Sequence, residues 1–108
     1  MHELSIATAI VEACVDRAAG NRIIRIRVEV GQLAAILPDS LHFCFELCAQ
    51  NTTAEGATLE IVEIPGRALC VACGEAIMLS SPLGQCMCGG RLRITDGDQL
   101  RMRDMEIA

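Results

Sequence analysis

The chain has 108 residues, a mass of 11.6 kDa and a formal net charge of −5 at pH 7. This length suits one domain with a small appendage and excludes a multidomain enzyme with separate cofactor and substrate domains. A hydrophobic fraction of 52% excludes a disordered chain. Because the chain is acidic and has two aromatic residues, it offers no basic surface or base-stacking platform, and we expect no nucleic-acid partner.

Apolar stretches in the sequence are too short to span a membrane. The longest unbroken one is six residues, Ala68 to Cys73, against about 18 for a spanning helix. The first residues lack the basic stretch and apolar segment of a secretory signal. The seven cysteines are an odd number, which argues for reduced thiols in a reducing compartment. We therefore predict a cytoplasmic protein without membrane contact.

The first half of the chain has the periodicity of two helices and a strand. Residues 4–19 place apolar side chains three or four positions apart, which predicts an amphipathic helix that ends at Gly20. Residues 22–32 alternate between apolar and charged side chains, as a half-buried strand does. Pro38 suits the first position of a second helix, which we expect to continue to about Gln50.

The second half contributes two strands and a region of different composition. Residues 58–64 predict a strand, and residues 100–107 alternate less regularly as another. Two helices and three strands make a small α+β fold, which we expect to contain a three-stranded antiparallel sheet. Residues 67–93 are rich in Cys, Gly and small residues. We predict two domains, one formed by 1–66 with 94–108 and an inserted one formed by 67–93.

Four of the seven cysteines form two close pairs that are followed by glycine. Cys70 and Cys73 form a CxxC pair, and Cys86 and Cys88 form a CxC pair. Four thiolates make the closed tetrahedral ligand set of a structural zinc site. The alternatives are thiols without a metal and an iron–sulfur cluster, although the spacings of familiar clusters differ. An insert of this size has too little core to fold without a bound metal.

The N-terminus brings together donors that suit a different metal. The α-amine of Met1, the amide nitrogen of His2 and the His2 imidazole form two fused chelate rings, and Glu3 can add a fourth donor. This set favours square-planar Ni²⁺ or Cu²⁺. Because many chains begin with Met-His, the pattern alone does not assign a site.

A second histidine lies near two cysteines on the second predicted helix. Cys44 and Cys48 share a face one turn apart, whereas His42 lies about 200° from Cys44 around the helix axis. The three side chains therefore do not converge on a metal, and core packing is the better interpretation of the cysteines.

Catalytic motifs are missing from the sequence. It contains no GxSxG, no glycine-rich phosphate loop and no HExxH. With only His2 and His42 available, a general base would have to be a carboxylate. We predict that the protein is not an enzyme.

Five segments in order resemble one known family. They are MHELSIA, VEVGQL, PDSLHFCFE, AEGATLEI, and CxxCG followed by CxCGG. Over nearly the whole chain they resemble the HypA/HybF nickel metallochaperones of hydrogenase maturation.

The resemblance implies both metals and the partners. It places nickel on Met1, His2 and Glu3, and structural zinc on Cys70, Cys73, Cys86 and Cys88. It also implies delivery of Ni(II), with a HypB-type GTPase, to the large subunit of a [NiFe] hydrogenase. Similar proteins in some bacteria also serve urease, and a monomer or a homodimer is expected. The family usually has a second CxxC pair, but Gln85 stands where its first cysteine is expected, which bears on zinc affinity or local geometry although the ligand count is still four.

A small zinc-binding adaptor is the rival interpretation from a different functional class. In that protein zinc shapes a surface for a partner, and the N-terminus is inert. Both interpretations predict one zinc per chain. Only the metallochaperone requires nickel binding that is lost in His2→Ala.

Overall fold

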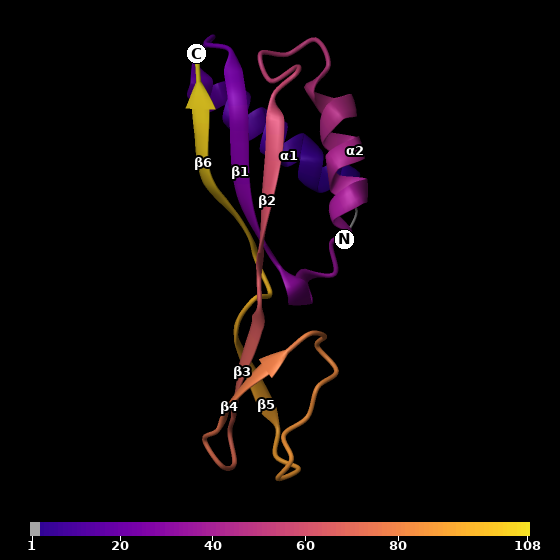
Figure 1. Ribbon diagram of the computed structural model, residues 1–108, viewed down its shortest axis with the longest axis vertical. Helices are drawn as coiled ribbons and strands as arrows, with labels where there is room; N and C mark the ends of the chain where they lie inside the picture. Colours follow the sequence, from indigo (N-terminus) through magenta and orange to yellow (C-terminus); the bar gives the residue numbers. More distant parts are fainter. Residues whose placement is uncertain (1–2) are drawn as a thin grey trace. The chain divides into compact units, whose positions relative to one another are not determined.

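The computed structural model describes residues 3–108, which form two compact units. The first contains the described residues up to Val28 with Ile36–Val62 and Arg101–Ala108, and the second contains Glu29–Ala35 and Glu63–Leu100. In chain order the elements are α1 Glu3–Ala18, β1 Ile23–Gly31, the 3₁₀ helix η1 Gln32–Ala34, α2 Pro38–Ala49, β2 Thr58–Ile64, β3 Gly66–Cys70, β4 Ala76–Leu79, β5 Leu92–Asp96 and β6 Leu100–Ile107 (Figure 1).

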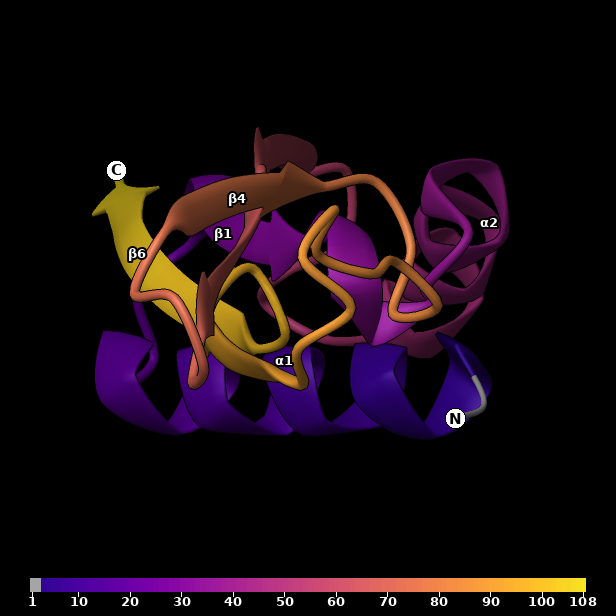
Figure 2. The same ribbon diagram turned by 90° about the horizontal axis from the view of Figure 1, so that it is seen from below.

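Both predicted helices are present in the first unit. α1 ends before Gly20, which has a φ of 90°, and α2 begins with Pro38 in its first turn. α2 packs over the N-terminal half of α1 (Figure 2), where the Thr8 Oγ1 atom lies 3.4 Å from the Cys48 Sγ atom. No helix within residues 3–108 has the length and apolar character needed to cross a membrane. The buried stripe of α1 is formed by Ala7, Ile10, Val11, Cys14 and Ala18.

The sheet of the first unit has the strand order β2-β1-β6. On the central strand β1, Ile26 and Val28 are buried, whereas Arg25 and Arg27 are half-buried on the opposite face. This alternation confirms the predicted half-buried strand. The two arginines connect the three strands through ion pairs with N···O distances of 3.2 to 3.5 Å, namely Arg25–Glu60, Arg25–Glu106, Arg27–Glu60 and Arg27–Asp104.

The strand directions are mixed, so the prediction of an all-antiparallel sheet is wrong for one strand pair. β6 is antiparallel to β1, because the Ala108 N–H at its end donates to the carbonyl oxygen of Arg22, just before β1 begins. β2 runs parallel to β1 (Figure 1), since contacts advance together along the chain from Arg22–Glu55 to Arg27–Glu60. The reason is that α2 returns the chain between these strands, and such a crossover joins parallel strands.

The second unit contains a three-stranded sheet that the sequence analysis did not predict. Its strand order is β4-β3-β5, and both pairs are antiparallel. The core is small: Leu33, Ala68 and Leu79 are buried, and Ile77 and Leu92 pack against them. Strands of four or five residues are too short to show a clear two-residue period among cysteines and glycines.

The second unit is larger than the insert predicted at residues 67–93. β5 continues to Asp96 because it pairs with β3, which itself begins at Gly66. The segment 29–35 also belongs to this unit, since Leu33 lies in its core. The predicted boundaries therefore separate residues that fold together.

Candidate metal centre

Two tight turns in the second unit carry the four paired cysteines. Cys70 ends β3, and Cys73 lies in the turn to β4, where the Gly74 N–H donates to the carbonyl oxygen of Cys70 at 2.9 Å. The CxC pair precedes β5, and the Gly89 N–H donates to the carbonyl oxygen of Cys86 at 2.9 Å. Gly74 and Gly89 have φ values of 77° and 81°, which favour glycine. The glycine after each pair thus permits the turn that presents the sulfurs.

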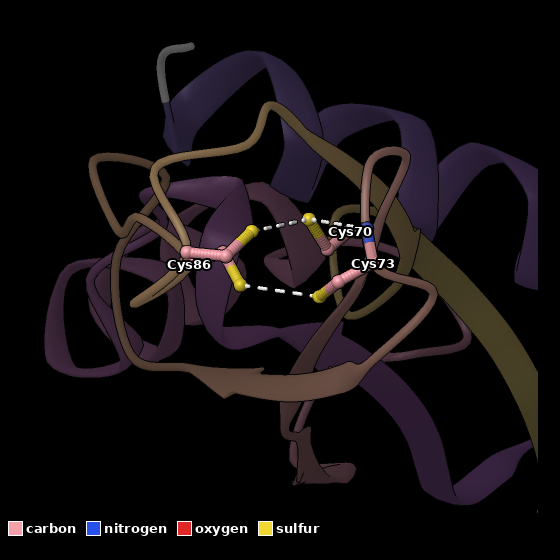
Figure 3. A group of neighbouring side chains, drawn as sticks. Cys70, Cys73 and Cys86 are labelled. Carbon is pink, nitrogen blue, oxygen red and sulfur yellow. Dashed lines mark hydrogen bonds between the residues drawn. The ribbon is translucent and has the colours of Figure 1, made fainter.

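The four sulfur atoms converge, as Figure 3 shows for the labelled side chains. The Cys70 Sγ atom lies 3.5 Å from that of Cys88, and the Cys73 Sγ atom lies 3.6 Å from that of Cys86. All four Sγ atoms lie within 4.8 Å of one another. A tetrahedron with metal–sulfur bonds of about 2.3 Å has edges of about 3.8 Å. The sulfur positions therefore fit a closed tetrahedral metal site, with Gln85 taking no part.

Two of the cysteines are buried and two are exposed. Cys70 and Cys86 belong to the interior of the second unit, whereas Cys73 and Cys88 lie at its surface. Backbone N–H groups also point at the sulfurs, from Cys73 to the Cys70 Sγ atom at 3.5 Å and from Gly90 to the Cys88 Sγ atom at 3.3 Å. Such hydrogen bonds favour the thiolate, which is the form that binds a metal.

Gly90 is a site residue that the sequence analysis missed. A Cβ atom on Gly90 would lie 2.7 Å from the Cys70 Sγ atom and 3.1 Å from the Cys88 Sγ atom. The backbone can approach both sulfurs only because this residue has no side chain. The second glycine of the CxCGG motif was the signal available in the sequence.

The thiols of the cluster differ in acidity. The backbone N–H of Cys73 is the main cause that lowers the pKa of Cys70 to about 6. The backbone N–H of Cys88 also lowers the pKa of Cys86, but the Cys88 thiol, burial and the other thiols outweigh it and raise that pKa to about 12. Four thiolates at these distances repel one another, and a bound divalent cation removes that repulsion.

Of the three residues predicted to bind nickel, Met1 and His2 lie outside the described residues. Glu3 is the first residue of α1 and is half-buried. Its carboxylate Oε2 atom accepts a hydrogen bond from the Leu37 N–H at 3.3 Å, at the residue that precedes α2. The Glu3 carboxylate therefore lies where both helices of the first unit begin.

The histidine and two cysteines of α2 do not form a second cluster. Cys44 and Cys48 are half-buried, and Cys48 faces Thr8 of α1, whereas His42 is exposed. This arrangement agrees with the packing role predicted for the two cysteines.

Known proteins match this chain over almost its full length. The family described as "Hydrogenase/urease nickel incorporation, metallochaperone, hypA" matches residues 1–107. The hydrogenase maturation factor HypA of Nostoc punctiforme is 44% identical over 108 residues, covering 99% of this chain and 96% of that protein. The corresponding factor of Rippkaea orientalis is 47% identical over 109 residues, with the same coverage of both chains.

Solved structures show the same fold. The solution structure of the nickel metallochaperone HypA from Helicobacter pylori has a TM-score of 0.70 at 22% sequence identity, covering 99% of this chain and 97% of that one. The predicted α+β fold with two helices and a separate cysteine-rich unit is therefore confirmed. Since the family match and the identities agree with the resemblance noted in the sequence, the chain belongs to the HypA family of nickel metallochaperones, which are maturation factors for hydrogenase and not enzymes.

Proposed function

We propose that this chain binds Ni(II) at its N-terminus and delivers it to a [NiFe] hydrogenase during maturation. The observation that carries the proposal is the family match over residues 1–107 in a chain that begins Met1-His2-Glu3. The α-amine of Met1 and the amide and imidazole nitrogens of His2 supply three donors suited to square-planar nickel.

The position of Glu3 supports this assignment. Its carboxylate is tied to the Leu37 N–H at the start of α2, so the residue after the chelating nitrogens is held on a rigid element. A chelate fixed at one end loses less conformational entropy when it binds metal. The exchangeable part of the proposed site is then confined to Met1 and His2, with the Glu3 amide or carboxylate as the fourth donor.

We further propose that the cysteine cluster binds a structural zinc ion. A set of four cysteines leaves no open coordination position for a substrate, which is typical of structural zinc. The metal would link the turn after β3 to the turn before β5. The small hydrophobic cluster of Leu33, Ala68 and Leu79 supports the need for such a link.

The same proposal defines the cellular setting. We place the protein in the cytoplasm, in keeping with seven free cysteines. A HypB-type GTPase and the large subunit of the hydrogenase are its proposed partners, with urease as a second client. The family description, which names hydrogenase and urease, supports both clients.

A nickel titration of the untagged, zinc-loaded protein tests the proposal. We expect one Ni(II) per chain by calorimetry, and we expect binding to be lost in His2→Ala and in a variant extended at its N-terminus. His42→Ala is the matched control, because it removes the other histidine, which is exposed on α2, and should leave binding unchanged. If the wild-type protein holds one zinc but binds no nickel, or if His2→Ala binds nickel normally, the adaptor interpretation is correct instead.

A further inference from the structure

Arginine and apolar side chains gather on one face of the sheet in the second unit. In the antiparallel register, Arg67 of β3 lies opposite Met78 of β4, and Leu69 of β3 lies opposite Arg93 of β5. Opposite residues of antiparallel strands point to the same side, and so do residues two apart on one strand. These four side chains therefore share one face of the sheet.

The same face continues toward the first cysteine turn. Val71 follows β3, and its N–H donates to the carbonyl oxygen of Arg91 at 2.9 Å, which extends the pairing of β3 with β5. The opposite face carries the buried Ala68, Cys70 and Leu79. We call the side that points away from this core the outer sheet face, and it contains Arg67, Leu69, Val71, Met78, Arg91 and Arg93. Asp96 of β5 lies opposite Arg67 at the irregular end of the β3–β5 pairing, and its carboxylate accepts a hydrogen bond from the Gly97 N–H at 2.9 Å.

Most of the outer sheet face is exposed, with Leu69 half-buried, and its three guanidinium groups are unpaired within residues 3–108. Val71 is 59% exposed, Met78 is 63% exposed, and the three arginines are exposed as well. Within the described part of the chain, Arg25 and Arg27 of the first unit form ion pairs. None of the guanidinium groups of Arg67, Arg91 and Arg93 has a hydrogen-bond or ion-pair partner there. A chain of net charge −5 thus presents three free cations beside apolar side chains.

We propose that the outer sheet face binds an acidic segment of a partner protein, with apolar side chains placed between its carboxylates. Guanidinium groups pair with carboxylates through two parallel hydrogen bonds, which gives both affinity and orientation. The apolar side chains of the segment would cover Val71, Leu69 and Met78, which line the face next to the arginines. The surface goes beyond the nickel role, because it contains none of the proposed nickel ligands.

An acidic polypeptide suits this face better than a nucleic acid. Single-stranded nucleic acids are held by base stacking on aromatic side chains in addition to basic residues. The second unit has no aromatic residue, since the two of this chain, Phe43 and Phe45, lie on α2. Its apolar residues are aliphatic and suit leucine-like side chains.

The test uses the full-length, zinc-loaded protein labelled with ¹⁵N. The probe is a short synthetic peptide of alternating glutamate and leucine, compared with one in which lysine replaces glutamate. We expect the acidic peptide to shift the amide signals of residues 67–71, 76–78 and 91–93, and the basic peptide to leave them unchanged. In the triple variant Arg67→Gln/Arg91→Gln/Arg93→Gln, the affinity for the acidic peptide should fall by about tenfold or more. Added salt should also lower this affinity in the wild type. Arg17→Gln, on α1, is the matched control and should have no effect.

Four outcomes would overturn the proposal. The first is a peptide that shifts other residues, or that binds the triple variant as well as the wild type. A second is an oligothymidylate that binds this face more tightly than the acidic peptide. The third outcome is a wild-type protein that does not bind the peptide but self-associates, while the triple variant does not self-associate. A second copy of the chain would then be the occupant of this face. In the fourth, the triple variant loses its zinc, which would show that the arginines balance the charge of the thiolates.

Discussion

Gly31 packs directly against Gly97, so that a Cβ atom on Gly31 would collide with the carbonyl group of Gly97. Two backbone hydrogen bonds flank this contact: the Gly31 N–H donates to the carbonyl oxygen of Gln99 at 2.9 Å, and the Leu33 N–H donates to that of Gly97 at 2.8 Å. The contact fixes the segment 29–35 in the second unit.

Gly31→Ala should therefore destabilise the protein strongly. We expect a loss of about 2–4 kcal/mol in the free energy of unfolding, because backbone atoms must move to admit the methyl group. Gly20→Ala is the control, since Gly20 has a φ of 90° but no atom within 4 Å of its Cβ position, and it should cost only about 1 kcal/mol. Urea denaturation measures the free energy of unfolding of both variants. An equal decrease in the two would contradict the importance of the close contact between Gly31 and Gly97.

Removal of one sulfur from the cluster should unfold the second unit alone. In Cys70→Ser we expect zinc to fall well below one per chain and the amide signals of β3, β4 and β5 to lose their dispersion. The signals of α1 and α2 should remain dispersed, because those helices have a core of their own. Cys48→Ser removes a half-buried thiol outside the cluster and should retain zinc. A Cys70→Ser protein with full zinc and an intact second unit would show that the cluster does not hold the metal.

The CxC spacing should already be sufficient for zinc. Because the Cys86 Sγ atom lies 3.6 Å from that of Cys73, a fifth thiol in Gln85→Cys should not slow zinc loss to a chelator. Gln85→Cys/Cys86→Gln, which restores a CxxC spacing, should lose zinc faster than the wild type. A colorimetric chelator follows the rates, and slower loss from Gln85→Cys would show that the CxC pair is strained.

The helices and the half-buried strand were predictable because each buries one face over many residues. In α1 the apolar side chains repeat through four turns, and in β1 they alternate with arginines. The second unit gave no such signal, since β4 has four residues and part of the core comes from Leu33, distant in sequence. The cysteine cluster was predictable from spacing alone, but the role of Gly90 depends on a contact between two turns that only the structure reveals.

Nickel and zinc should leave the protein at different pH. Nickel binding at the proposed N-terminal site needs an unprotonated α-amine and a neutral imidazole, whose reference pKa values in model peptides are about 7.7–8.0 and about 6.5. Protons should therefore expel nickel between about pH 7.5 and 6, whereas zinc-bound thiolates resist protonation until lower pH. Chelator competition for each metal measures the two releases. Zinc that departs before nickel would contradict an N-terminal delivery site.

Cys14 should be the slowest cysteine to react outside the metal cluster. It is fully buried on α1, its Sγ atom lies 3.9 Å from the Met102 Sδ atom, and burial raises its pKa despite the opposing charge of Arg17. Mass spectrometry after iodoacetamide treatment at pH 7.5 should find Cys48 modified well before Cys14. The Cys14 thiol ionises above about pH 8.5 in the unfolded chain, whereas burial keeps it protonated to higher pH in the folded protein. Its contribution to the free energy of unfolding should therefore be present at neutral pH and decrease above about pH 8.5. Equal alkylation rates would contradict the burial of Cys14.

The position of β6 after the cysteine turns in the order of elements has a consequence for biosynthesis. β1 is the central strand of its sheet, yet the partner on one side, β6, is made last. While the ribosome adds the cysteine turns, β1 can pair with β2 but has an unpaired edge on its other side, which is the kind of edge that recruits other chains. The proposed nickel donors thus leave the ribosome long before the sheet is complete, and a chain truncated before residue 100 would present those proposed donors on an unfinished fold.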